Sequence, residues 1–211
     1  MMITQPKPNL KTETWVDGSW EDYLKTLESI PAEQGKSYYY HQQYRIEMSP
    51  LGNNHASDHS LINYMISLYA TLKSIELNGK DNCTFRKPNF REAQPDLAFY
   101  IGDNAHSIPW ETAIINLDQY PAPNLVIEIA NVSLADDLGT KRLLYEDLGI
   151  EEYWIVDVKK AKITAFAIEK QGSYRLNTSQ VLNSLDINLI EQALHQSRET
   201  SHSQVGAWLL N

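Results

Sequence analysis

The chain has 211 residues, of which 42% are hydrophobic, and a formal net charge of −9. This length and composition suit one domain with a sizeable core, and the acidic balance argues against indiscriminate binding to polyanions, although it leaves room for a local basic groove. No apolar run is long enough to cross a bilayer, and Cys83 is the single cysteine, which excludes an internal disulfide and a thiolate metal cluster. We therefore expect a cytoplasmic protein without a membrane segment.

The first half of the chain predicts two helices and several strands. Residues 1–17 are expected to form a loose arm, and Ser19 and Asp22 form a capping box for a helix that continues to Ile30. The next segments predict a strand or hairpin over 38–48, a loop over 49–54, and a helix over 55–77 that is stopped by Asn78-Gly79. Two strands, over 82–87 and 95–101, are separated by a loop around Pro88. The region over 102–123 is rich in loops, with a short helical piece near Trp110.

The second half predicts a strand, a helix and a strand in a crossover unit with parallel strands. Residues 124–130 form a short apolar run after two prolines, which is typical of a strand buried on both faces. A helix over 136–148 follows, capped by Ser133 or Asp136 and ended by Gly149, and then a strand over 151–158. The remaining segments predict an edge strand over 163–168, a strand through Leu176, and two short helices over 189–211 broken near Thr200.

Two charged residues stand where apolar side chains are expected. Glu128 interrupts the buried strand, and Lys141 falls in the apolar stripe of the helix between Leu138 and Tyr145. An ionised carboxylate inside a sheet is costly unless it is paired or bound to a metal. These residues alone are equally compatible with a structural ion pair, or a lysine whose ammonium reaches past the stripe to water, and with a working site.

A second carboxylate has a similar setting. Asp96 opens the apolar run over 97–101, and Ala98 shares its face, just as Ala130 shares the face of Glu128. These small neighbours leave room beside both carboxylates, which would repel each other unless a cation or a proton joined them. Oxygen donors without cysteine or spaced histidines favour Mg²⁺ or Mn²⁺. The alternative for Asp96 is a strand-entry residue that caps a turn after Pro95.

Together these motifs resemble the Uma-type restriction endonuclease family of the PD-(D/E)XK nuclease superfamily. The resemblance runs from about Tyr38 to Leu176 and rests on Pro95-Asp96, on Glu128-Ile129-Ala130, on Asp137 and Lys141 four residues apart, on Tyr145 and Gly149, and on the run EYWIVD over 152–157. It implies an α/β fold of the mixed α+β kind, with a restriction-endonuclease-like central mixed sheet flanked by helices. We expect an N-terminal arm and helix over 1–36, a nuclease-like core over 37–186, and C-terminal helices over 187–211 that pack on the same domain.

The resemblance also implies roles for these residues. Asp96 and Glu128 would hold Mg²⁺, or Mn²⁺ in its place, with the backbone carbonyl of Ile129. Ala130 stands where most of the superfamily has its catalytic lysine, and Lys141 on the next helix would replace it near the attacking water and the scissile phosphate. The implied reaction is metal-assisted hydrolysis of a phosphodiester in DNA.

Three further residues match the family less firmly. Glu47 would be another acidic member of the site, His55 would contact substrate or order the site, and Asp137 would orient Lys141. Glu47 could instead be an exposed strand residue, His55 could cap or pack a helix, and Asp137 could be a solvent-facing acid at a helix N-terminus. The chain also departs from the family pattern, because Gln42-Gln43 replaces the usual Asp-Gly and an acidic residue before it is missing. This departure puts a third acidic ligand in doubt.

We therefore predict a Mg²⁺-dependent DNA endonuclease, a phosphodiester hydrolase with one catalytic domain. The alternative is a non-cleaving binding or structural module with a degenerate nuclease fold, and a weaker one is a hydrolase of another phosphoester. Basic residues that could line a groove for DNA are Arg86, Lys87, Arg91 and Lys141-Arg142, whereas the lysines over 159–162 are better explained as solvated surface. The exposed strand edge and the aromatic surplus leave a homodimer open.

Overall fold

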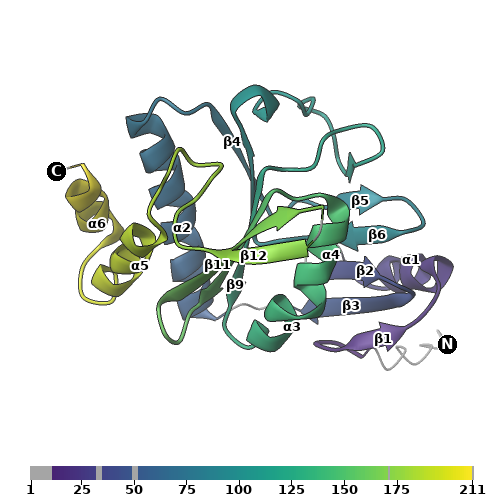
Figure 1. Ribbon diagram of the computed structural model, residues 1–211. Helices are drawn as coiled ribbons and strands as arrows, with labels where there is room; N and C mark the ends of the chain where they lie inside the picture. Colours follow the sequence, from purple (N-terminus) through teal and green to yellow (C-terminus); the bar gives the residue numbers. More distant parts are fainter. Residues whose placement is uncertain (1–10, 32–34, 49–51, 171, 211) are drawn as a thin grey trace.

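The computed structural model describes residues 11–31, 35–48, 52–170 and 172–210. Its main sheet has six strands in the order β12-β11-β10-β9-β7-β4 (Figure 1). These strands are β4 (Leu77–Asp81), β7 (Leu97–Ile101), β9 (Leu125–Ala130), β10 (Glu152–Asp157), β11 (Lys162–Glu169) and β12 (Gly172–Leu176). Strands β9 and β10 are parallel and the other neighbours are antiparallel, so the sheet is mixed as predicted.

A second sheet of six short strands has the order β1-β3-β2-β6-β5-β8. Its strands are β1 (Trp15–Asp17), β2 (Gly35–Tyr40), β3 (Gln43–Met48), β5 (Phe85–Lys87), β6 (Arg91–Ala93) and β8 (Ile115–Asn116). The chain passes from β6 in this sheet to β7 in the main sheet through only Gln94, Pro95 and Asp96. The Pro95-Asp96 motif therefore lies in the connector between the two sheets.

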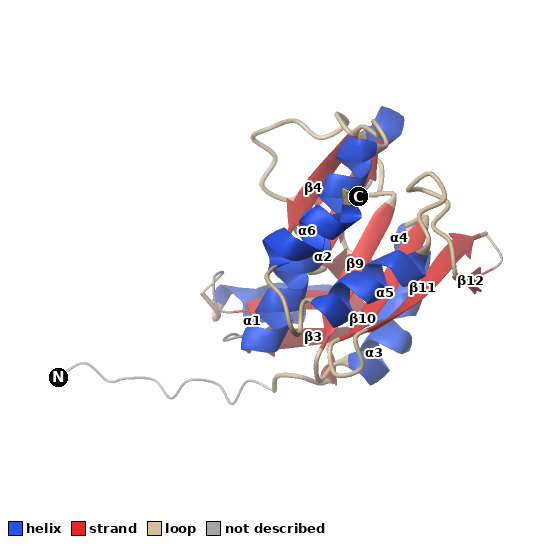
Figure 2. Ribbon diagram, turned by 90° about the vertical axis from the view of Figure 1, so that its left-hand side faces the viewer, coloured by secondary structure: helices blue, strands red, loops and turns tan. Residues whose placement is uncertain are grey.

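The described part of the chain also contains helices, most of which pack against the faces of the two sheets. They are α1 (Trp20–Glu28), α2 (Asn53–Leu72), the 3-10 helix η2 (Gly102–Asn104), α3 (Leu134–Leu138), α4 (Thr140–Leu148), α5 (Ile187–Gln196) and α6 (His202–Leu209). Helices α2, α5 and α6 lie on one face, and α3, α4 and the second sheet lie on the other (Figures 1 and 2). Among the described residues, none of these helices has the length and apolar character that a membrane span requires.

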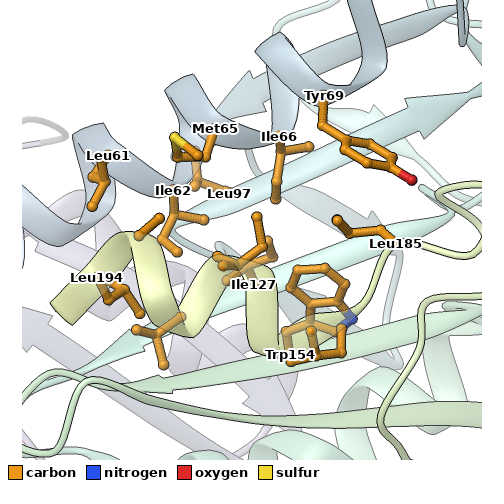
Figure 3. Packing of buried hydrophobic residues seen from close by; sticks show 14 of the residues in the cluster. Leu61, Ile62, Met65, Ile66, Tyr69, Leu97, Ile127, Trp154, Leu185 and Leu194 are labelled. Atoms are coloured by element: carbon orange, nitrogen blue, oxygen red, sulfur yellow. The ribbon is translucent and has the colours of Figure 1, made fainter. Parts of the chain in front are cut away.

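Alternation along β7 and β9 separates two hydrophobic cores. Leu97 and Ile127 point to the side of α2, where they pack with residues of that helix and of α5 (Figure 3). Ala98 and Val126 point to the opposite side, among residues of the second sheet and α4. This confirms the predicted faces, and both strands are buried on both sides because each face has its own cover.

Other predicted features are confirmed. Ser19 and Asp22 form the capping box of α1, and β2 and β3 form a hairpin whose two turn residues, His41 and Gln42, have φ of 48° and 59°. Gly149 ends α4 in the left-handed conformation with φ of 80°. The two C-terminal helices are separated near Thr200 as expected.

The prediction that the helix over 55–77 stops at Asn78-Gly79 was wrong. Helix α2 ends at Leu72, where Ser74 adopts a left-handed conformation with φ of 54°. Asn78 and Gly79 instead lie inside β4, whose residues pair with β7. The sequence Asn78-Gly79 is typical of a helix end, but pairing with β7 determines its conformation here.

The helix predicted over 136–148 is two helices, α3 and α4, with a break at Gly139 where ψ is −107°. Ser133 occupies the N-cap position of α3, but its hydroxyl donates a hydrogen bond to Asp137 Oδ2 rather than capping the helix. Strand β11, which we expected at an edge, lies between β10 and β12, and β12 forms the edge.

Three smaller predictions also need correction. Residues 15–17, assigned to the arm, form β1, and the segment around Pro88 joins β5 and β6 as a hairpin. Near Trp110 the chain makes a turn closed by the Thr112 amide on the Pro109 carbonyl instead of a short helix. Residues 11–14 of the arm form no helix or strand, and residues 1–10 of the arm and 49–51 of the predicted loop lie outside the described residues.

The central position of β9 yields a test of the fold. Ile127 is fully buried between the main sheet and α2, so Ile127→Ala is expected to lower the free energy of unfolding by about 3 kcal/mol through lost burial and a residual cavity. Urea denaturation followed by circular dichroism measures this change. Val132→Ala, at an 80% exposed position, is the control and should change stability by less than about 0.5 kcal/mol. Equal effects of the two substitutions would contradict the arrangement.

Candidate active site

Two carboxylates of the main sheet share one ammonium from the second sheet. Asp96 directly precedes β7, Glu128 lies in the middle of β9, and both side chains are 2% exposed. Lys36 in β2 places its Nζ 2.7 Å from Asp96 Oδ1 and 3.6 Å from Glu128 Oε2. The two acidic residues, 32 positions apart in the sequence, therefore meet at one positively charged atom in the layer between the sheets.

Asp96 is held through both of its oxygens. Oδ2 accepts a hydrogen bond of 2.7 Å from the backbone N–H of Ile129, and Oδ1 lies 3.3 Å from His55 Nε2 as well as beside Lys36. Burial raises the pKa of Asp96, but Lys36 and His55 outweigh burial and hold it well below its usual range. Asp96 is thus ionised, and it links β7, β9, β2 and α2 rather than capping a local turn.

Glu128 is oriented by two tyrosines. Its Oε1 accepts hydrogen bonds from the hydroxyls of Tyr38, at 3.0 Å, and Tyr145, at 2.6 Å. Burial raises the pKa of Glu128 to about 7, even though the ammoniums of Lys141 and Lys36 act in the opposite direction. The tyrosines leave Oε2 directed toward Lys36.

Lys141 is buried inside the same cluster, with a side chain that is 1% exposed. Its Nζ lies 2.8 Å from Glu47 Oε1, 2.9 Å from Asp137 Oδ1 and 3.7 Å from Glu128 Oε1, and 4.1 Å from the centre of the Tyr38 ring. Burial lowers the pKa of Lys141, but these three carboxylates raise it well above its usual value. The side chain is therefore a fixed positive charge and does not reach past the apolar stripe into solvent.

The carboxylates that hold Lys141 are themselves anchored. Glu47 accepts a hydrogen bond of 2.8 Å from Arg45, which also lies 3.1 Å from Asp136. Asp137 is fully buried, and its Oδ2 accepts the Ser133 hydroxyl at 2.6 Å. Glu47 is not an exposed strand residue and Asp137 does not face solvent, so the structure excludes the alternatives given to both.

The structure thus brings together all six side chains that the sequence singled out. They are Glu47, Asp96, Glu128, Asp137, Lys141 and His55, which is buried near the start of α2. Their contacts are geometric facts, whereas their catalytic roles remain predictions. Ile129 contributes its backbone N–H to Asp96, and its carbonyl as a metal ligand also remains a prediction.

Sequence reasoning missed Lys36 and gave Tyr38 and Tyr145 no role at the site. Lys36 belongs to the segment that we assigned to the N-terminal arm and helix, and it lies on β2 as the second residue of that strand. A signal was present in the alternation of Lys36, Tyr38 and Tyr40 on one face of the strand, the face that packs on the main sheet. A lysine on the same strand face as buried tyrosines indicates that polar groups lie opposite that face.

The donor set can be tested against a divalent cation. Among the described residues, no three His, Cys, Asp or Glu side chains form a group that could hold a metal ion. Mg²⁺, however, is usually held by one or two carboxylates with waters and substrate oxygens completing its shell. Asp96 and Glu128 converge on one positive atom, and their carboxylate oxygens are donors of the kind that such an ion takes.

The basic residues expected to line a DNA groove are largely paired with carboxylates. Arg86 pairs with Glu92, Arg91 lies 2.7 Å from Asp147, and Arg142 lies 3.4 Å from Glu146. Lys162, which we assigned to the solvated surface, lies 2.7 Å from Glu191. These pairs leave little uncompensated positive charge around the cluster, so an anionic substrate would depend on the charges of the site itself.

A mixed sheet with helices on both faces, and with acidic residues gathered where its inner strands meet a lysine, defines a restriction-endonuclease-like fold. The chain belongs to the Uma2 family, whose description is "Putative restriction endonuclease" and whose model matches residues 20–200. A structure described as "a putative nuclease belonging to DUF820" from Anabaena variabilis is similar, with a TM-score of 0.58 and 16% identity over 83% of this chain and 98% of that one. At this identity the likeness shows the fold. No curated protein matches the chain.

The pairing of Glu47 yields a pH-dependent prediction. Burial raises its pKa, but Lys141 and Lys36 outweigh burial and lower the pKa to about 2. Because the folded pKa is below the unfolded one, ionised Glu47 stabilises the fold above about pH 4.5, and this contribution is lost as the pH falls toward 2. Glu47→Gln should lower the free energy of unfolding by about 2 kcal/mol at pH 7 and by less at pH 3.5.

Urea titrations at several pH values between 3.5 and 7 measure this difference. Glu111→Gln, at an exposed loop position, removes the same charge and should leave stability nearly unchanged at every pH. A Glu47→Gln effect that stays constant or grows on acidification would refute the assigned pairing.

Proposed function

We propose that this protein is a metal-dependent endonuclease that hydrolyses phosphodiester bonds in DNA. Its membership of a family of restriction endonucleases supports a nuclease in general. The single observation that carries the finer proposal is the convergence of Asp96 and Glu128 on one cation position, with the buried Lys141 ammonium 3.7 Å from Glu128. This arrangement places acidic metal ligands and a fixed positive charge side by side, as phosphodiester hydrolysis requires.

In this proposal some residues of the chain would hold a divalent ion, and others would keep those ligands in place. A bound Mg²⁺ or Mn²⁺ would supply Lewis acidity and a more acidic water. Asp96 and Glu128, with the Ile129 carbonyl, would hold that ion. His55 and the Ile129 N–H keep Asp96 in place, and the two tyrosine hydroxyls keep Glu128 in place. These contacts would make the ligand set rigid before substrate arrives.

Lys141 is suited to stabilise negative charge rather than to remove a proton. Glu47 and Asp137 keep its ammonium protonated, so it is a poor general base. A preorganised ammonium beside the cation position would orient the attacking water and stabilise charge that develops on the phosphoryl oxygens. Glu47 and Asp137 are positioning residues in this proposal, because they act through Lys141.

Two observations favour the second candidate, a binding or structural module that does not cut. Lys36 already occupies the position between Asp96 and Glu128, and Gln42-Gln43 stands where the family usually has Asp-Gly. A permanent ammonium at this position would neutralise the acidic pair without any metal. Such a module would bind DNA in the presence and absence of a chelator and would not nick it.

Plasmid cleavage tests the proposal. The protein incubated with supercoiled plasmid should nick it with Mg²⁺ or Mn²⁺ but not with chelator, and Asp96→Ala should lower the rate by about a hundredfold or more. Asp118→Ala, at an exposed loop position, is the matched control and should cut like the wild type. Circular dichroism establishes that both variants are folded.

Two outcomes would contradict this assignment. Cleavage that survives Asp96→Ala would show that another protein or another site cuts. Binding of plasmid without cleavage in either metal would favour the non-cleaving module. The ratio of linear to nicked plasmid also reports whether both strands are cut in one encounter, as a homodimer would do.

A further inference from the structure

Lys36 is the charged member of the cluster that the proposed mechanism does not use. Its side chain is 12% exposed, and its Nζ lies 2.7 Å from Asp96 Oδ1, 3.6 Å from Glu128 Oε2 and 4.0 Å from Glu47 Oε2. It is the one lysine that contacts both predicted metal ligands within the described part of the chain. Its ammonium therefore has the charge and the place that a bound cation would have.

The ammonium and a divalent cation cannot occupy this place together. A divalent cation held by Asp96 and Glu128 would have to approach the same carboxylates that Lys36 Nζ now contacts at 2.7 and 3.6 Å. Two positive centres on the same carboxylates also repel strongly where water is largely excluded. Either Lys36 moves away or the ion does not bind.

The displaced ammonium would turn toward solvent on the same face of β2. The Lys36 side chain is 12% exposed, whereas the side chains of Asp96 and Glu128 are 2% exposed. Lys36 thus lies at the boundary between the buried acidic pair and water, and a change of its rotamers would carry the ammonium outward without moving β2.

We propose that Lys36 is a displaceable internal counter-ion. Without metal it holds Asp96 and Glu128 together, and a divalent cation binds between them only by driving the Lys36 ammonium outward toward solvent. Lys36 is a positioning residue in this inference, and it sets how much metal the site requires. The inference rests on the proposed function, because it takes Asp96 and Glu128 to be the metal ligands.

Metal binding to a charge-neutral variant tests the inference. Lys36→Met keeps the length of the side chain and removes the competing charge, so the protein should bind Mn²⁺ about tenfold more tightly than the wild type, or better, in a calorimetric titration. Lys159→Met removes one exposed lysine in the turn after β10 and should bind Mn²⁺ like the wild type. Mn²⁺ should also raise the melting temperature of Lys36→Met more than that of the wild type.

The possible results separate this inference from the proposed function. Wild type that binds Mn²⁺ while Lys36→Met binds equally or less tightly would overturn the displacement and leave the nuclease proposal standing. Failure of both proteins to bind would overturn both ideas. Tighter binding by Lys36→Met that persists after Glu128→Ala is added would place the ion elsewhere and also overturn the displacement.

A measurement on the wild type covers the case in which Lys36→Met does not fold. Acetylation with a water-soluble ester, followed by mass spectrometry of the peptides, reports how readily each lysine reacts. Mn²⁺ should increase the labelling of Lys36 severalfold relative to Lys159 in the same sample, because the ammonium leaves its carboxylate partners. An unchanged or lower ratio in a sample that binds Mn²⁺ would overturn the inference.

Discussion

The structure depends on keeping two ammoniums and four carboxylates together between two sheets. Removing one partner of a buried ion pair typically costs about 3–5 kcal/mol, because the other charge is left without compensation. The local features around the cluster are explained by this constraint. Tyr38 and Tyr145 donate hydrogen bonds to Glu128, and the Ser133 hydroxyl donates to Asp137 instead of capping α3. The break between α3 and α4 lies between Asp137 and Lys141, whose side chains form an ion pair across it.

Much of this site could be predicted from sequence because its residues violate patterns. Glu128 and Lys141 stand out since a buried strand and an apolar helix stripe normally exclude charge. Period-two alternation placed Ala98 and Ala130 beside the carboxylates, and the two separate cores confirm those faces. The resemblance to a nuclease family then connected Asp96 to Glu128, which no local pattern could do, since the two lie on strands that pair only in the fold.

The features that escaped prediction are set by contacts between distant parts of the chain. The second sheet consists largely of strands of two or three residues, too short for a periodic signal, and its order joins β2 to β6 across the whole of α2. Lys36 was missed because its significance comes from strands that follow it by 60 residues or more in the sequence. Gly139 could be read as a tolerated glycine within one helix, and only the packing of α3 and α4 on the main sheet shows the chain breaking there.

The three-residue connector from β6 to β7 has a consequence for how the molecule can move. Because Asp96 is part of this short tether, the two sheets cannot separate or slide without dragging the carboxylate with them. Proline at position 95 stiffens the same tether. A displacement of the second sheet relative to the main sheet would therefore move the Asp96 carboxylate and change its distance from Glu128.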